Sequence, residues 1–112
     1  MIMDITEKIK NQIAKNPILI YMKGSPNLPS CGFSAQAIKA LSACGERFAY
    51  IDILQNNDIR MELPKYANWP TFPQLWIDGK LIGGCDIIME MYRNGELQKL
   101  IKVTAEKYKN RE

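Results

Sequence analysis

The chain opens with isoleucines spaced four residues apart. Ile5, Ile9 and Ile13 share one face of a helix that follows Asp4, whose carboxylate can cap the first turn. Asn16-Pro17 ends this helix, because proline lacks the N–H that a helix interior needs. The pattern predicts an amphipathic helix whose isoleucine face packs on a core.

The next segments have the pattern of two strands joined by a helix. Ile18–Met22 is apolar on both faces and bounded by turn residues, which is typical of a buried strand. Residues 35–44 are rich in alanine and precede Gly45, so they predict a helix. Residues 48–53 predict a second strand. In a strand–helix–strand unit of this length the two strands are parallel and the crossover is right-handed.

The second half predicts a helix, a hairpin and two more helices. Asn57 or Asp58 is expected to cap a helix around residues 59–63. Asp78-Gly79 lies between the apolar segments 74–77 and 80–82, and this dipeptide favours a type I′ turn. After Gly83-Gly84, Asp86 opens a helix, and another follows residue 95.

This order of elements predicts an α/β fold. A four-stranded mixed sheet with helices on both faces accommodates all of them. The chain has 112 residues, a length typical of one domain, and we expect that domain to span residues 1–112.

Charge and hydropathy give weaker indications. Lys and Arg number 15 and Asp and Glu number 12, and the two signs are interspersed. We therefore expect neither a nucleic-acid nor a membrane partner. The first residues lack the basic and apolar regions of a secretion signal, which favours a cytoplasmic location.

The absence of histidine limits the chemistry. It excludes Ser-His and Cys-His catalytic pairs and Cys2His2 zinc sites. The three cysteines, Cys31, Cys44 and Cys85, contain no Cys-x-x-Cys spacing. An odd number of scattered cysteines is a poor disulfide framework, so a reducing compartment is expected.

Cys31 is the first candidate for chemistry. It follows a strand and a proline-bearing loop, where a helix is expected to begin, and a helix N-terminus stabilises a thiolate. Lys23 at the strand end adds positive charge. Cys44 lies at the other end of the same helix, where the dipole disfavours a thiolate, and is predicted to be core.

Three segments resemble one known family. Residues 23–34, with the run Cys-Gly-Phe-Ser at their end, resemble the active-site segment of monothiol glutaredoxins of that class. Residues 69–74, Trp-Pro-Thr-Phe-Pro-Gln, and residues 83–86, Gly-Gly-Cys-Asp, resemble two further segments of the family. The resemblance covers essentially the whole chain and implies a thioredoxin-like (glutaredoxin) fold.

Ser34 stands where a dithiol oxidoreductase needs its second thiol. Serine cannot form a disulfide, so two-thiol turnover on this motif is excluded. One activated thiolate remains, as a metal ligand or for exchange with glutathione. An iron–sulfur cluster takes about four ligands. The resemblance implies a [2Fe–2S] cluster that bridges a homodimer, with Cys31 of each chain and two glutathione molecules as ligands.

The resemblance also implies a glutathione site made of Lys23, Arg60, Phe72, Pro73, Cys85 and Asp86. The Lys23 and Arg60 side chains are cations that suit the glycyl carboxylate. A cis peptide before the proline is expected to leave the preceding backbone free to pair with the cysteinyl unit. The N–H groups that open the following helix suit the γ-glutamyl carboxylate, and the Asp86 carboxylate suits the ammonium.

Three functions stay open at this point. The first is a carrier of [2Fe–2S] clusters in iron homeostasis, whose partners by resemblance are apo iron–sulfur proteins and BolA-type proteins. The second is a glutathione-dependent oxidoreductase for protein–glutathione mixed disulfides, in which Cys31 attacks. The third is a redox sensor that pairs Cys31 with Cys85. The long loop before Cys31 favours the carrier, because the class that bears it shows weak oxidoreductase activity.

Overall fold

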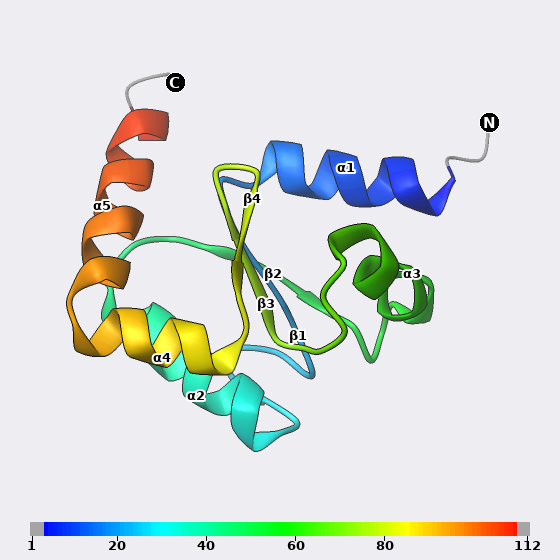
Figure 1. Ribbon diagram of the computed structural model, residues 1–112, viewed down its shortest axis with the longest axis horizontal. Coiled ribbons are helices and arrows are strands. Elements are labelled where there is room, and N and C mark those ends of the chain that lie inside the picture. Colours follow the sequence, from blue (N-terminus) through cyan, green and yellow to red (C-terminus); the bar gives the residue numbers. More distant parts are fainter. Residues whose placement is uncertain (1–3, 110–112) are drawn as a thin grey trace.

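The structure, a computed structural model, describes residues 4–109, in which four strands form one mixed sheet with helices on both faces (Figure 1). In chain order the elements are α1 (Ile5–Lys15), β1 (Ile18–Met22), α2 (Gly32–Ala43), β2 (Ala49–Asp52), α3 (Asn57–Ala67), β3 (Gln74–Ile77), β4 (Lys80–Gly83), α4 (Cys85–Arg93) and α5 (Glu96–Lys109). The strand order is β2-β1-β3-β4, with β1 parallel to β2 and the other neighbours antiparallel. The predicted α/β fold is confirmed.

Strand β1 lies between two hydrophobic cores. Ile20 and Met22 pack with residues of α2, α4 and α5. Leu19 and Tyr21 point to the other face and pack with residues of α1 and α3. Figure 1 shows the same division, with α1 and α3 on one side of the sheet and α2, α4 and α5 on the other. Because both faces are covered, the strand is apolar at every position.

The hairpin between β3 and β4 has the predicted turn. Asp78 and Gly79 both have positive φ, at 51° and 79°, as a type I′ turn requires. The Asp78 carboxylate accepts hydrogen bonds from the Lys107 ammonium, at 2.7 Å, and from the Tyr108 hydroxyl. The turn therefore holds the last part of α5 against the end of the sheet.

Helix α2 begins where the sequence predicts and α3 does not. Helix α2 starts at Gly32, three residues before the alanine-rich segment 35–44, because Cys31 acts as its N-cap and its sulfur accepts from the Ser34 N–H. The predicted helix start at Cys31 is confirmed. The N-cap of α3 is Asn56, not Asn57 or Asp58, and its side chain makes no capping bond. The Asp58 carboxylate instead accepts from the Lys8 ammonium at 3.1 Å and so links α3 to α1.

Smaller differences concern β2 and α4. Strand β2 spans Ala49–Asp52, one residue shorter at each end than predicted. Helix α4 begins at Cys85, and Gly84 rather than Asp86 is its N-cap. Asp86 is thus inside the first turn, where a carboxylate still interacts favourably with the helix dipole.

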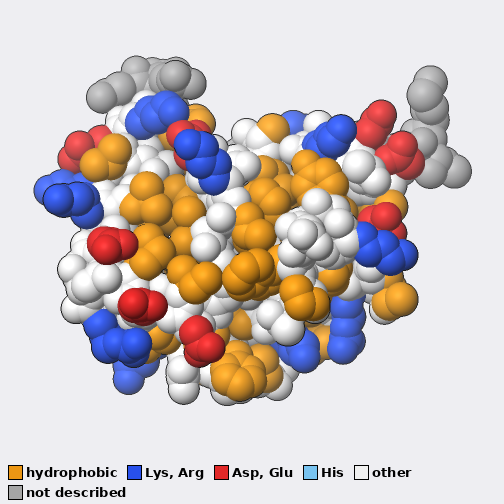
Figure 2. Space-filling view, in the orientation of Figure 1, with side chains coloured by type: hydrophobic (Ala, Val, Ile, Leu, Met, Phe, Trp, Pro, Cys, Tyr) orange, Lys and Arg blue, Asp and Glu red, His pale blue; other side chains and the backbone are white. Residues whose placement is uncertain are grey.

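The face seen in Figure 2 has hydrophobic side chains across its middle and charged side chains of both signs around its rim. Lys, Arg, Asp and Glu side chains share that rim, in keeping with their interspersed positions in the sequence. No helix within residues 4–109 has the length and hydropathy that a membrane span needs.

Candidate functional site

The loop after β1 is fixed by backbone contacts. Gly24 has φ 89°, and a Cβ there would lie 2.4 Å from the Leu28 carbonyl oxygen, so only glycine fits. The Ser30 N–H donates to the Lys23 carbonyl at 2.9 Å, which closes the loop on itself. The Gly24 N–H donates to the Asp52 carboxylate, also at 2.9 Å. The loop therefore presents Cys31 from a defined position at the carboxyl ends of β1 and β2.

Cys31 and Ser34 form the centre of the site. The Cys31 sulfur lies 3.3 Å from the Ser34 backbone nitrogen and 3.3 Å from its hydroxyl oxygen. Ser34 is fully buried, and its hydroxyl also accepts from the Lys23 N–H at 3.1 Å. One serine thus joins the thiol, the first turn of α2 and the end of β1.

These contacts favour the thiolate form of Cys31. Partial burial acts to raise the pKa of the thiol, but the Ser34 hydroxyl, the N–H groups of Ser34 and Phe33 and the charge of Lys23 outweigh it, so the pKa lies below its usual value. At the other end of α2, burial raises the pKa of Cys44, which packs against the core. The pKa values of the two thiols differ in the predicted direction, with burial rather than the helix dipole as the cause at Cys44.

A cavity of about 720 Å³ opens beside Cys31. Its wall consists of Lys23, Phe33, Arg60, Met61, Pro64, Trp69, Pro70, Thr71, Phe72, Gly84, Cys85, Asp86 and Ile87. Most of the predicted site residues therefore line one space. Cys31 and Pro73 lie outside that lining, and Pro73 is buried. The peptide bond between Phe72 and Pro73 is cis, as expected.

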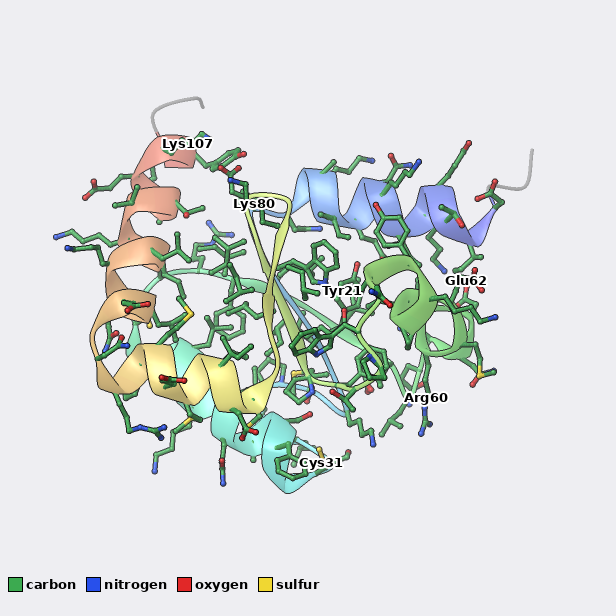
Figure 3. All side chains as sticks on the ribbon, in the orientation of Figure 1. Tyr21, Cys31, Arg60, Glu62, Lys80 and Lys107 are labelled. Carbon is green, nitrogen blue, oxygen red and sulfur yellow. The ribbon has the colours of Figure 1, made fainter. Side chains whose placement is uncertain are left out.

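The cavity combines groups of opposite charge. Lys23 and Arg60 contribute cations from β1's carboxyl end and from α3, and Asp86 contributes a carboxylate from α4. Figure 3 shows Cys31 and Arg60 on the same lower edge of the molecule, away from Lys80 and Lys107. The N-terminus of α4 also faces this space, because Gly84, Cys85 and Asp86 all line it.

Cys85 lies at the start of α4 but differs from Cys31 in its ionisation. Burial, followed by the negative charges of Asp86 and Cys31, raises the pKa of its thiol. Its sulfur lies 3.5 Å from the Gln36 side-chain oxygen, to which the S–H donates. Cys31 and Cys85 are thus within electrostatic reach, and all three cysteines are free. The pairing that a redox sensor requires stays a prediction.

Some residues that support or line the site were not identified from the sequence. Asp52 supports the loop through Gly24, and a signal for it exists, since it ends the strand parallel to β1. Phe33 and Met61 line the cavity and are mostly exposed, but nothing in their spacing distinguishes them from other surface positions.

The described residues 4–109 hold no metal cage of their own. Among residues 4–109 no three His, Cys, Asp or Glu side chains gather closely enough to hold a metal ion. Cys31 is the thiol whose environment favours the ionised, metal-binding form.

A family model and several relatives of known name are similar to this chain. The family model described as Glutaredoxin matches residues 18–82. Glutaredoxin 4 of Escherichia coli (strain K12) is 78% identical over 106 residues, which cover 95% of this chain and 92% of the relative. Glutaredoxin 4 of Pasteurella multocida is 66% identical over 106 residues, covering 95% and 97%.

Solved structures of glutaredoxins have a similar fold. Reduced apo GrxS14 of poplar has a TM-score of 0.74 and 38% identity, covering 88% of this chain and 90% of that one. The buckwheat glutaredoxin–glutathione complex has a TM-score of 0.76 and 29% identity, covering 89% and 90%. With Ser34 in place of a second active-site thiol, the chain belongs to the glutaredoxin family as a monothiol member.

Proposed function

We propose that two copies of this chain share a [2Fe–2S] cluster, with glutathione as co-ligand, and that the protein stores such clusters and passes them on. The observation that carries this proposal is a single thiol of lowered pKa, Cys31, beside a cavity that contains two cations and a carboxylate. No thiol at position 34 competes for that sulfur.

The cavity suits glutathione in size and charge. Its volume of about 720 Å³ is within the usual range for small-ligand sites. Lys23 and Arg60 match the glycyl carboxylate, while the N–H groups at the start of α4 match the γ-glutamyl carboxylate. Asp86 matches the ammonium group. The buckwheat relative, whose solved structure is a complex with glutathione, supports this assignment.

The donor set fits a shared cluster better than one held by a single chain. An iron–sulfur cluster takes about four ligands, most often thiolates. Cys31 supplies one thiolate per chain, and the other two cysteines have raised pKa values. Two chains and two glutathione molecules together supply four thiolates. Two α2 N-termini facing the anionic cluster add favourable electrostatics.

The same proposal includes the cellular role. The cluster is cargo, so the partners are apo iron–sulfur proteins that receive it and BolA-type proteins that associate with the complex. A reducing cytoplasm keeps Cys31 available as a thiolate. Iron homeostasis is the process that such a carrier serves.

Anaerobic reconstitution with iron, sulfide and glutathione tests the carrier. The parent chain should become brown, absorb visible light and sediment as a dimer. Cys31→Ser should lose the colour and the dimer, whereas Cys44→Ser, on the same helix, should keep most of both. Equal iron retention in Cys31→Ser and the parent would overturn the proposal, as would full cluster occupancy without any small thiol.

The lowered pKa of Cys31 supports a second activity, reduction of protein–glutathione mixed disulfides. The Cys31 thiolate attacks the glutathione sulfur, forms a new disulfide with it and releases the protein thiolate. A second glutathione thiolate then attacks that glutathione sulfur, which yields glutathione disulfide and restores the Cys31 thiolate. Brisk turnover of a glutathionylated protein, together with a colourless product of reconstitution, would favour this enzyme over the carrier.

A further inference from the structure

Gln74 is a fully buried polar residue at the start of β3. Its neighbours across the sheet are apolar or aromatic, and its backbone pairs with Tyr21 of β1. A buried side-chain amide without partners is costly, so the hydrogen bonds of this amide identify what it does.

The Gln74 amide connects two parts of the structure. Its nitrogen donates to the carbonyl oxygens of Trp69, at 3.0 Å, and Thr71, at 3.3 Å. Its oxygen accepts from the indole N–H of Trp76 at 3.2 Å. Both amide hydrogens are thus used on the segment before β3, and the oxygen is used within the strand itself.

The segment that Gln74 holds is one wall of the cavity. Trp69, Pro70, Thr71 and Phe72 all line that space. The start of the segment is held by a backbone hydrogen bond from the Trp69 N–H to the Pro64 carbonyl at 3.0 Å. The side chain of Gln74 adds two further hydrogen bonds to the backbone of this wall.

One of these bonds determines the direction of a backbone N–H. The peptide bond between Thr71 and Phe72 is trans and planar, so its N–H points opposite to its C=O. The Thr71 C=O points inward to the buried Gln74 amide. The Phe72 N–H consequently points away from the buried Gln74 amide. Phe72 is itself one of the residues that line the cavity.

We infer that Gln74 is a positioning residue for ligand binding: by holding the Thr71 carbonyl, it directs the Phe72 N–H into the cavity, where a carbonyl of a bound peptide accepts it. The ligand in this inference is glutathione, so the inference rests on the proposed function. The inference adds Gln74 as the residue that orients the backbone donor. Gln74 lies behind the wall and does not line the cavity.

Trp76 provides a matched control. Trp76→Phe removes the partner on the acceptor side of the Gln74 amide and leaves both donor bonds to the wall. Gln74→Met keeps a side chain of similar shape but removes both donors. Gln74→Asn keeps an amide but shortens the side chain, and it serves if Gln74→Met does not fold. Both residues are buried, so each change perturbs the core while only the Gln74 changes affect the wall.

The experiment is an NMR titration with reduced glutathione at a temperature where every variant is folded. We expect either Gln74 variant to bind about tenfold more weakly, the size typical of one lost hydrogen bond in a buried site. Trp76→Phe should stay within twofold of the parent. The pKa of the Cys31 thiol should be the same in all variants, because the contacts that lower it come from α2 and from Lys23, just after β1.

A second readout does not require glutathione binding. Backbone 15N relaxation of the free protein should show greater mobility at Thr71 and Phe72 in the Gln74 variants and no change in Trp76→Phe. A parent that binds no glutathione would refute the proposed function, and relaxation would still decide the role of Gln74. Unchanged mobility in the Gln74 variants, or glutathione affinity within twofold of the parent, would overturn the inference. An equal loss in Trp76→Phe would also overturn it.

Discussion

The Cys31 sulfur lies 3.3 Å from the hydroxyl oxygen of Ser34, so the residue that replaces a second thiol is itself a hydrogen-bond partner of the first. The same hydroxyl accepts from the Lys23 N–H, which leaves its own hydrogen available to the sulfur. Ser34 therefore has two effects on one atom. It prevents an intramolecular disulfide within the motif, and it stabilises the thiolate that remains.

Ser34→Ala should raise the pKa of the Cys31 thiol. Hydrogen bonds donated to a thiolate lower its pKa, and the hydroxyl is the largest of the contributions that do so here. Less thiolate is then present at neutral pH, and alkylation by iodoacetamide should slow. The pH dependence of that alkylation, measured in a Cys44→Ser and Cys85→Ser background, gives the pKa directly. Ser42→Ala, an exposed serine later on α2, should leave it unchanged.

Lys23→Ala and Asp86→Ala should each raise the glutathione concentration needed for cluster assembly. Each change removes a charge-assisted hydrogen bond worth on the order of 1.5–3 kcal/mol, or roughly ten- to a hundredfold in affinity. Visible absorbance after reconstitution at a series of glutathione concentrations measures the shift. Lys39→Ala removes an exposed lysine of α2 outside the cavity wall and should behave like the parent. Identical curves for all four proteins would contradict the assigned site.

The sequence identified features that depend on local chemistry. Ile18–Met22 showed its burial through an uninterrupted apolar run, and Asp78-Gly79 specified its turn through the need for positive φ. The cis peptide before Pro73 was expected only by family resemblance.

Contacts between segments that are distant in the sequence could not be predicted from local patterns. Asp52 supports Gly24 across 28 positions, and Cys85 donates to Gln36 across 49. No spacing rule connects such residues. The helix start at Cys31 was expected, but the alanine-rich pattern covered residues 35–44 alone, because Gly32 and Phe33 are weak helix formers and the sulfur of Cys31 supplies the cap.

Asp78→Asn should lower stability near neutral pH and have little effect in acid. Hydrogen bonds from Lys107 and Tyr108 hold the pKa of the Asp78 carboxyl below its usual value. A lowered pKa means that the ionised group stabilises the fold above the usual pKa of about 3.9, and that this stabilisation is lost as pH falls through the lower, folded-state pKa. The pair is partly exposed, so the difference should be about 1 kcal/mol or less.

Urea unfolding of the parent and Asp78→Asn from pH 2 to pH 7 tests this dependence. Asparagine tolerates the positive φ of 51° at this position, so the turn itself is retained. Glu106→Gln removes an exposed carboxylate from α5, and its stability relative to the parent should not change with pH in this way. A stability difference that is constant across the pH range would contradict the role of the Asp78 charge.

Ser34→Cys should convert the carrier toward a dithiol reductase. A thiol at this position lies beside the Cys31 sulfur, where the hydroxyl now sits at 3.3 Å, and rotation of the two side chains can bring the sulfurs to bonding distance. The resulting disulfide competes with iron for Cys31, because one sulfur cannot form both bonds. The variant should lose its reconstituted cluster faster in air than the parent, and it should gain reduction of protein disulfides.

Ser42→Cys is the matched control for that change. It adds a thiol to the exposed end of α2, more than two turns from Cys31, and should alter neither the cluster nor the activity. If the parent already reduces protein disulfides briskly and Ser34→Cys adds nothing, another thiol resolves Cys31. Cys85 is then the candidate, since Cys31 is close enough for its charge to help raise the pKa of the Cys85 thiol. A triple comparison of the parent, Cys85→Ser and Ser34→Cys separates these cases, because only a resolving Cys85 makes the parent's activity depend on residue 85.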